Sequence, residues 1–545
     1  RFEYKAKSLY SIVNNEIQFF GKTQSVFNKA FLNSLSFTSK LKKNLSVRGV
    51  VYLANDEQKQ NSSTITKYNL ENNPISFTED NFYVNKKTLA SSEIELKYSP
   101  NDKNYITNLF IFKNNPNKTA NNLLFNTDII NQNSNSENYT IYNHFNHTLQ
   151  LTEKTVLNNY FYIGNDKINE KSKISSPFLN SFLSLDTNQI INQNTNNKLF
   201  YIGNKSKLIN KFRKIDLTNT VQFEYSKEQF KNDFIANNQI IETYQNNANL
   251  KILNLFQENT LRYNFSRKID LTANLNFQNI QFNNNTFSTN LFLINPSIYF
   301  NIKKTGFGNF SFSFSENNSL PEINQLTTNY QLTDYRSFLQ GTTFQKPLKN
   351  QTISLNYSYY NDEKRFSINT NIFYSNSKSI LNTSSNLTSD FNFNSYIQTK
   401  GNESYNFNFS LVNYSRKLKL ASKIETLNNW ITSPLNVNST EFSNAKSFSN
   451  SIKYSATTYF KSKINFDFGF SYNYFQSNFQ GIKTTNTTKD AFLNINYKVS
   501  KTILAESNNS LYYVNNKNYS FNNLVLSYTP LYSKFSYRLI VNNLV

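Results

Sequence analysis

Apolar and polar residues alternate with a period of two along most of this 545-residue chain, and this alternation limits its fold more than any other feature. Residues 491–499 show it in one stretch, where the apolar positions are Ala491, Leu493, Ile495, Tyr497 and Val499. Successive side chains of a strand point to opposite faces, so this segment is a strand with one apolar and one polar side. Few segments place apolar residues at helical spacing. We therefore expect an almost entirely antiparallel β chain.

The connections between the expected strands fall into two kinds. Residues 352–360 and 365–374 both alternate, and the four polar residues 361–364 between them predict a hairpin with a tight turn. Residues 55–73, 131–138 and 376–389 are rich in Asn, Ser and Thr, and we interpret them as long loops. Short turns at one end and longer loops at the other are typical of bacterial membrane barrels.

Aromatic residues make up 16% of the chain although all apolar residues together reach only 38%. A membrane barrel accounts for both values, because its outward face is apolar with aromatic girdles while its inward face is polar. The apolar runs, such as 291–294, are far shorter than the roughly 18 residues that a membrane-spanning helix needs. The chain has no cysteine, so neither a disulfide framework nor a thiolate site is available.

The net charge of +22 carries less information than its size suggests. Asn, Lys, Ile, Phe and Tyr are frequent, and these are residues that A+T-rich codons encode. No nucleic-acid-binding motif accompanies the charge, and we expect no nucleic-acid partner. No catalytic or phosphate-binding motif occurs either, so we expect neither an enzyme nor a cofactor.

The length sets the size of the barrel. If a strand with its share of the turns takes about 25 residues, the chain holds about 22 strands, which is within the known range. We therefore predict one domain over residues 1–545, an all-β transmembrane barrel of roughly 20–22 antiparallel strands.

Barrels of this size are plugged. No mixed α/β segment of the chain resembles a plug, so we expect the plug upstream of Arg1 or supplied separately. The start at Arg1, without a leader, indicates a processed or excised piece.

Two regions carry a recognisable pattern of residues. Residues 310–381 contain a loop with a Pro and a Gln-Leu, an Asp farther on, and a Gly and a Pro before a hairpin. These positions are Pro321, Gln325, Leu326, Asp334, Gly341 and Pro347. The C-terminal residues 520–545 form a second region that ends in an aliphatic-x-Asn-Leu motif at Asn543 and Leu544.

Both regions resemble the outer-membrane β-barrel of TonB-dependent receptors, in the branch common in Bacteroidota. Thr342, Thr343 and Gln345 depart from the family's Gly-Asn-Pro-x-Leu turn. Family chains usually continue beyond the second motif, so the resemblance implies that the last strands are missing. It also implies a receptor in the bacterial outer membrane that imports a large or scarce ligand, with a plug and TonB as partners. Outer-membrane lipid and lipopolysaccharide would surround it, and a surface lipoprotein or other subunits of an outer-membrane complex would be further partners.

Two other functions stay open. The first is a non-transporting barrel that acts as a scaffold in an outer-membrane assembly or secretion complex. The second is a soluble β-rich adhesin.

One basic segment is a candidate binding site. Its four cations are all at odd positions and would share one face of a strand: Lys205, Lys207, Lys211 and Arg213. Inside the lumen they would attract an anionic ligand, and outside they would contact lipid phosphates. The simpler interpretation is a solvated turn, since Gly203 and Asn204 open the segment.

The two histidines and a repeated five-residue sequence are conspicuous, but neither predicts a functional site. The only histidines, His144 and His147, would lie on opposite faces of a strand and are therefore not expected to share a metal. The sequence Phe-Tyr-Ile-Gly-Asn occurs twice, at 161–165 and 200–204, which is too few copies for a propeller.

Overall fold

The structure is a computed structural model of the chain, and it describes residues 6, 9–12, 27–68, 74–186, 189–285, 287–344, 346–439, 441–514, 516–531 and 535–542. Strands dominate the described part. The strand segments are β1 (Phe27–Lys42), β2 (Leu45–Tyr68), β3 (Ile75–Asn101), β4 (Asn104–Asn114), β5 (Asn117–Phe125), β6 (Asp128–Thr152), β7 (Thr155–Ser175), β8 (Ile191–Lys211), β9 (Ile215–Ala236), β10 (Gln239–Ile240), β11 (Asn246–Asn264), β12 (Ile269–Asn284), β13 (Ser288–Thr305), β14 (Gly308–Ser319), β15 (Gln331–Leu332), β16 (Ser337–Gln340), β17 (Leu348–Asn361), β18 (Phe366–Leu387), β19 (Asn392–Thr399), β20 (Asn402–Ser415), β21 (Leu420–Val437), β22 (Ser443–Thr458), β23 (Ile464–Phe479), β24 (Ile482–Lys498), β25 (Ile503–Val514), β26 (Lys517–Tyr528) and β27 (Tyr537–Val541). The helical elements are α2 (Pro177–Phe182) and the short 3-10 turns η1 (Glu242–Tyr244) and η2 (Ile323–Gln325).

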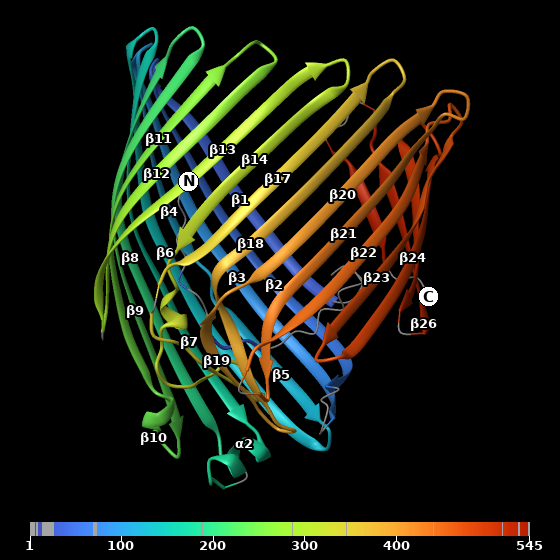
Figure 1. Cartoon of the computed structure of the whole chain (residues 1–545). Helices are drawn as coiled ribbons and strands as arrows, with labels where there is room; N and C mark the ends of the chain where they lie inside the picture. The colour runs from blue at the N-terminus through green and yellow to red at the C-terminus, as the bar shows by residue number, and fades with distance from the viewer. Residues whose placement is uncertain are drawn as a thin grey trace.

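The wall of the molecule is one antiparallel ladder that follows the order of the chain. Each long strand pairs with the next one, from β1 with β2 to β26 with β27, and the strands tilt around a barrel (Figure 1). Strands β4 and β5 are one wall strand interrupted at residues 115–116, since both pair with β3 and with β6. Strands β10, β15, β16 and β19 are accessory segments at one end. In the described residues the 27 segments therefore make 22 wall strands, and the predicted all-β barrel of roughly 20–22 strands is confirmed.

No pairing between β27 and β1 occurs among the described residues. The expectation that the last strands are missing stays a prediction.

The predicted alternation of faces is confirmed by burial. From Tyr162 to Ile174 on β7 and from Ile191 to Gly203 on β8, every second residue is buried toward the lumen, and the residues between them are more exposed on the outside. On β24, Leu493 is 43% exposed on the outer face. The neighbouring Asn494 points inward, where its amide donates a hydrogen bond to Asp467 at 3.3 Å.

The two ends of the barrel differ as expected. Residues 361–366 and 42–45 are tight hairpin turns at one end, which is the upper end in Figure 1. The opposite end carries the longest connections, 320–347 and 176–190, together with α2 and β10 (Figure 1). Membrane barrels have short turns on the periplasmic side and longer loops outside, so we infer that the long-loop end faces outward.

The three segments expected to be long loops are mostly strand. Residues 55–68 belong to β2, 131–138 to β6 and 376–387 to β18, so the interpretation as loops is wrong there. The physical reason is that the strands continue beyond the apolar outer surface, where both faces are polar and alternation disappears from the sequence. Thr388 and Ser389 lie outside these strands, and residues 69–73 lie outside the described residues.

The described helical elements are α2, η1 and η2. None of them is long and apolar enough to cross a membrane.

Candidate functional site

The connection between β14 and β17 folds back into the barrel and forms a cap at the long-loop end. Leu332 and Phe338 of this connection are fully buried, in one apolar cluster with wall residues such as Phe125 and Phe234. Strand β16 of the cap pairs in parallel with β19. This loop therefore packs inside the barrel at this end, and we call it the cap (residues 320–344).

The residues of the first family-like pattern are brought together in and around this cap. Pro321 and Leu326 are buried, and Gln325 closes a capping box in which its side chain accepts from the N–H of Glu322 at 2.9 Å. At Gly341 a Cβ would lie 2.5 Å from the backbone of Thr327, so only glycine fits this close approach.

Asp334 holds the tip of the cap. Its carboxylate accepts hydrogen bonds from the N–H groups of Arg336 and Ser337, at 2.9 and 2.8 Å. Burial raises the pKa of the Asp334 carboxyl, although these two donors act to lower it. Pro347 directly precedes β17 at the base of the connection. Asn543 and Leu544 lie outside the described residues, so the second motif has no structural account.

Arg336 joins the cap to the wall, a role that the sequence did not indicate. Its guanidinium lies 4.1 Å from the ring centroid of Phe77 and 5.0 Å from that of Phe125. It also donates to the carbonyl oxygens of Thr388 and Ser389 at 3.3 and 3.2 Å. A guanidinium group can contact aromatic rings and donate hydrogen bonds to carbonyl oxygens at the same time, so arginine suits this position better than lysine.

Carboxylates on the lumenal face of β7 hold an N-terminal segment. Asp166 accepts from the N–H of Ala6 at 2.9 Å, and Glu170 accepts from those of Leu9 and Tyr10 at 3.1 and 3.2 Å. Both carboxylates are almost completely buried. The sequence does not predict this contact. Acidic residues are common on the polar face of a strand, and nothing near Asp166 or Glu170 in the sequence indicates that they bind a segment about 160 residues away.

A chamber of about 950 Å³ lies on the lumenal side of β13–β22. Amide and hydroxyl groups dominate its lining, including Asn356, Asn369 and Asn408, and its charged residues are Lys303, Glu425 and Lys453. Such a surface offers many neutral donors and acceptors to a polar ligand or to another folded segment.

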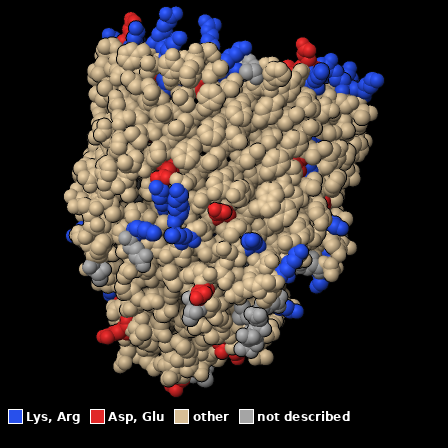
Figure 2. Space-filling view, in the orientation of Figure 1, with Lys and Arg blue, Asp and Glu red and all other residues tan. Residues whose placement is uncertain are grey.

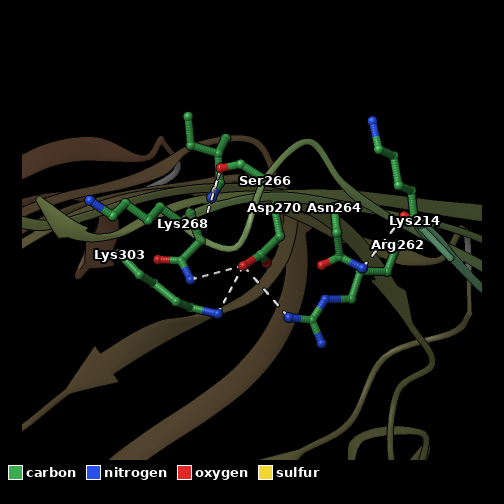
Figure 3. A network of polar contacts seen from close by, with 9 residues as sticks. Lys214, Arg262, Asn264, Ser266, Lys268, Asp270 and Lys303 are labelled. Carbon is green, nitrogen blue, oxygen red and sulfur yellow. Dashed lines mark hydrogen bonds and ion pairs between the residues drawn. The ribbon is translucent and has the colours of Figure 1, made fainter.

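A charged network lies at the edge of this chamber (Figure 3). Asp270 of β12 accepts from Nζ of Lys303 at 2.8 Å, and a guanidinium nitrogen of Arg262 lies 3.6 Å away. The three residues come from the neighbouring strands β11, β12 and β13, and their side chains converge in Figure 3. Two cations thus balance one buried carboxylate and leave this part of the lumen positive.

The predicted basic segment lies mainly on the lumenal face of β8. Lys205 and Lys207 stand opposite the buried Gln222 and Thr220, and Lys211 continues the same face. Arg213 lies in the turn between β8 and β9. This placement favours an anionic ligand in the lumen over a lipid outside, and the binding role itself stays a prediction.

The two histidines lie on opposite faces, as predicted. His144 is buried in the lumen beside the rings of Tyr142 and Tyr160, and His147 lies 3.3 Å from the amide oxygen of Asn104 on the outer face. Within the described residues, no three side chains of His, Cys, Asp or Glu are placed to hold a metal ion.

No protein-family model and no curated protein matches this sequence. Solved structures with a similar fold do exist. The siderophore receptor PirA of Pseudomonas aeruginosa aligns with 90% of this chain and 77% of its own, at a TM-score of 0.50 and 10% identity. The ferric enterobactin receptor PfeA of the same organism, as a mutant in complex with enterobactin, aligns with 89% of this chain and 74% of its own, at a TM-score of 0.54 and 10% identity.

The fold is that of TonB-dependent receptor barrels. At 10% identity this similarity concerns the fold alone, and the expected outer-membrane location agrees with it.

Proposed function

We propose that this chain is the barrel of an outer-membrane receptor that takes up a large polar ligand, as the resemblance to TonB-dependent receptors implies. One observation carries the proposal. A wall of 22 strands surrounds a chamber of about 950 Å³ that is lined mainly by neutral polar groups, and the cap packs into the barrel at the long-loop end. A lumen with both features suits uptake of a bound ligand better than free diffusion through an open pore.

The proposal includes a plug domain, upstream or supplied separately, and energy from TonB. It also includes membership of the Bacteroidota branch, a single barrel domain over residues 1–545, contact with a surface lipoprotein, and no catalytic activity. The similar structures are named as receptors for siderophores or ferric enterobactin. Ferric siderophores are therefore the first ligands to try.

The test is uptake by the source bacterium after deletion of the gene. We expect the deletion strain to lose uptake of one labelled ligand from a panel that starts with ⁵⁵Fe-siderophores, and the wild-type gene to restore it. The inward variant Asn369→Trp narrows the chamber and should lower uptake several-fold. The adjacent Ile368→Trp, on the outer face opposite Tyr359 and Leu411, is the matched control and should not.

Unchanged uptake of every ligand in the deletion strain, together with loss of an outer-membrane complex, would contradict transport and favour the scaffold function.

A further inference from the structure

A short extended piece of the chain's own N-terminal region lies inside the lumen, between the wall and the cap. The structure describes its residues 6 and 9–12, which we call the lumenal segment. Tyr10 and Ile12 are buried, and Ser11 between them is exposed. Side chains that alternate in this way belong to an extended backbone. The lumenal segment therefore lies in the barrel as a bound peptide lies in a groove.

Two buried carboxylates of β7 hold the lumenal segment through its backbone. Asp166 and Glu170 accept hydrogen bonds from three of its N–H groups. The other oxygen of each carboxylate accepts from a hydroxyl group of β6, that of Thr140 at Asp166 and that of Ser134, at 3.3 Å, at Glu170. The wall thus positions both carboxylates itself. Every residue except proline offers a backbone N–H group, so these bonds do not select a sequence.

The cap holds the lumenal segment from the other side. The N–H of Ser11 donates to the carbonyl oxygen of Thr333 at 2.8 Å, so the segment is joined to the main chain of the cap. In peptide recognition, main-chain hydrogen bonds to an extended edge give affinity, and pockets for the side chains give specificity. The lumenal segment has the first of these features, and its side chains supply the second.

Three side chains of the lumenal segment enter apolar surroundings. Tyr10 and Ile12 belong to the cluster that joins the cap to the wall, and the hydroxyl of Tyr10 donates to Gln132 at 2.8 Å. Leu9 packs against a second apolar cluster, which includes Leu326 of the cap. The groove therefore suits a bulky apolar residue, an aromatic residue directly after it and an apolar residue two positions farther on.

The same end of the wall also holds the cap by its main chain. Gln193 of β8 accepts from the N–H of Leu332 at 3.1 Å and donates to its carbonyl oxygen at 2.7 Å. Asn246 of β11 makes the same two bonds with Asn329, at 3.0 and 3.1 Å. Both amide side chains are almost completely buried. Buried polar side chains at the capped end thus bind the main chain of two separate extended segments.

We propose that the groove between β6, β7 and the cap is a binding site for extended peptides, which the lumenal segment occupies in this structure. The ligand is a peptide of another polypeptide with the order apolar, aromatic, any residue, apolar. It replaces the lumenal segment and offers the same N–H groups to Asp166 and Glu170, so these buried carboxylates keep their donors. The site is made of other residues than the chamber, and the proposal does not rest on uptake.

The test is a titration of the purified full chain, in neutral detergent, with the fluorescent peptide Ala-Lys-Ser-Leu-Tyr-Ser-Ile, the sequence of residues 6–12. In the wild type the tethered segment competes at an effective concentration on the order of 1 mM. Tyr10→Ala combined with Ile12→Ala weakens this competitor, and we call it the released variant. It should bind the peptide at least about tenfold more tightly than the wild type. Equal or weaker binding by the folded released variant would overturn the proposal.

The main-chain contact is tested in the released variant. Glu170→Gln removes the charge that two N–H groups share and should weaken peptide binding about tenfold. Glu137→Gln makes the same change on the outer face of β6 and should leave the affinity unchanged. A peptide that is methylated at the backbone nitrogen of its tyrosine lacks one donor and should also bind about tenfold more weakly. Full affinity of the methylated peptide, or equal affinities of the two Glu variants, would overturn the proposal.

A label on the lumenal segment keeps the test informative if the released variant fails to fold. Ser11→Cys places a single cysteine at an exposed position and leaves Tyr10 and Ile12 unchanged. An environment-sensitive dye on this cysteine reports whether the segment leaves the groove. Millimolar peptide should change the emission in a saturable way, and a scrambled peptide should not. An emission that the peptide leaves unchanged, or that both peptides change equally, would overturn the proposal.

The class of ligand is tested with a peptide of unrelated sequence that has Ile, Phe and Val at the three apolar positions. Its affinity for the released variant should lie within about tenfold of that of the first peptide, because the three side chains are similar in volume and polarity. Binding of the chain's own sequence alone would show a fixed internal contact and overturn the assignment to a peptide ligand. These measurements do not involve uptake, so they can fail while the proposed transport holds.

Discussion

At the scale of single residues, the repeated Phe-Tyr-Ile-Gly-Asn sequence has a structural explanation. The two copies lie on the antiparallel strands β7 and β8, where Tyr162 stands opposite Gly203 and Tyr201 stands opposite Gly164. Each tyrosine ring occupies the space over the other strand's glycine, and both rings are buried. An aromatic ring across from a glycine compensates for the missing side chain in a sheet.

We predict that Gly203→Ala destabilises the barrel. A Cβ at Gly203 would lie 2.4 Å from the ring of Tyr162, so the ring must leave its place beside Gln222 and Glu224. Overpacking of this kind costs about 1–3 kcal/mol. Urea unfolding of the chain in lipid vesicles measures this loss in the free energy of unfolding. Gly306→Ala is the control, since nothing lies within 4 Å of its Cβ, and an equal loss of stability in both variants would contradict the explanation.

The sequence identified several residues but rarely their partners. The motif residues Gln325, Asp334 and Gly341 were predicted as a group, and the structure places them in the cap. The link from Arg336 to Phe77 and the contacts of Asp166 with Ala6 span more than a hundred residues. No local pattern encodes which distant segment enters a lumen, so these contacts could not be predicted.

At the scale of the elements, alternation predicted the strands well inside the apolar region and poorly outside it. The sequence predicts the hairpin of β17 and β18 together with its turn. One face of each strand meets lipid and the other meets the lumen, so apolar and polar residues alternate clearly there. For the outer part of β2 the sequence predicts a loop, because both of its faces are polar there. Backbone pairing, which the sequence does not display, extends that strand to Tyr68.

Strand β24 allows a direct test of its two faces. Leu493→Arg places a charge on the outer, lipid-facing side and should hinder assembly by about 2–4 kcal/mol if the position is near the midplane. Asn494→Arg places the same charge in the lumen beside Asp467 and should be tolerated. Heat-modifiable migration on gels measures the folded fraction. Similar losses in both variants would show that the orientation of β24 is wrong.

At the scale of the whole molecule, cations border the apolar surface on both sides. Figure 2 shows Lys and Arg gathered at the short-turn end, next to a wide region of the visible face with little charge. The turns there contain, for example, Lys154, Lys214, Lys364 and Lys417. On the outer face of β8, Lys198 lies at the opposite edge, between Phe200 and Asn196. The apolar surface therefore lies close to the short-turn end, and the strands extend well beyond it at the capped end.

We propose that this barrel spans the outer membrane with its capped, long-loop end outside. Because the chain has no cysteine, a single introduced cysteine reports its own location without background. Ser389 is exposed at the long-loop end, and Glu363 is exposed in the short turn between β17 and β18. The decisive measurement is labelling of Ser389→Cys and Glu363→Cys in intact cells with a membrane-impermeant maleimide. We predict that Ser389→Cys is labelled at once and Glu363→Cys only after the outer membrane is permeabilised, and the reverse order, or equal labelling of both, would contradict the account.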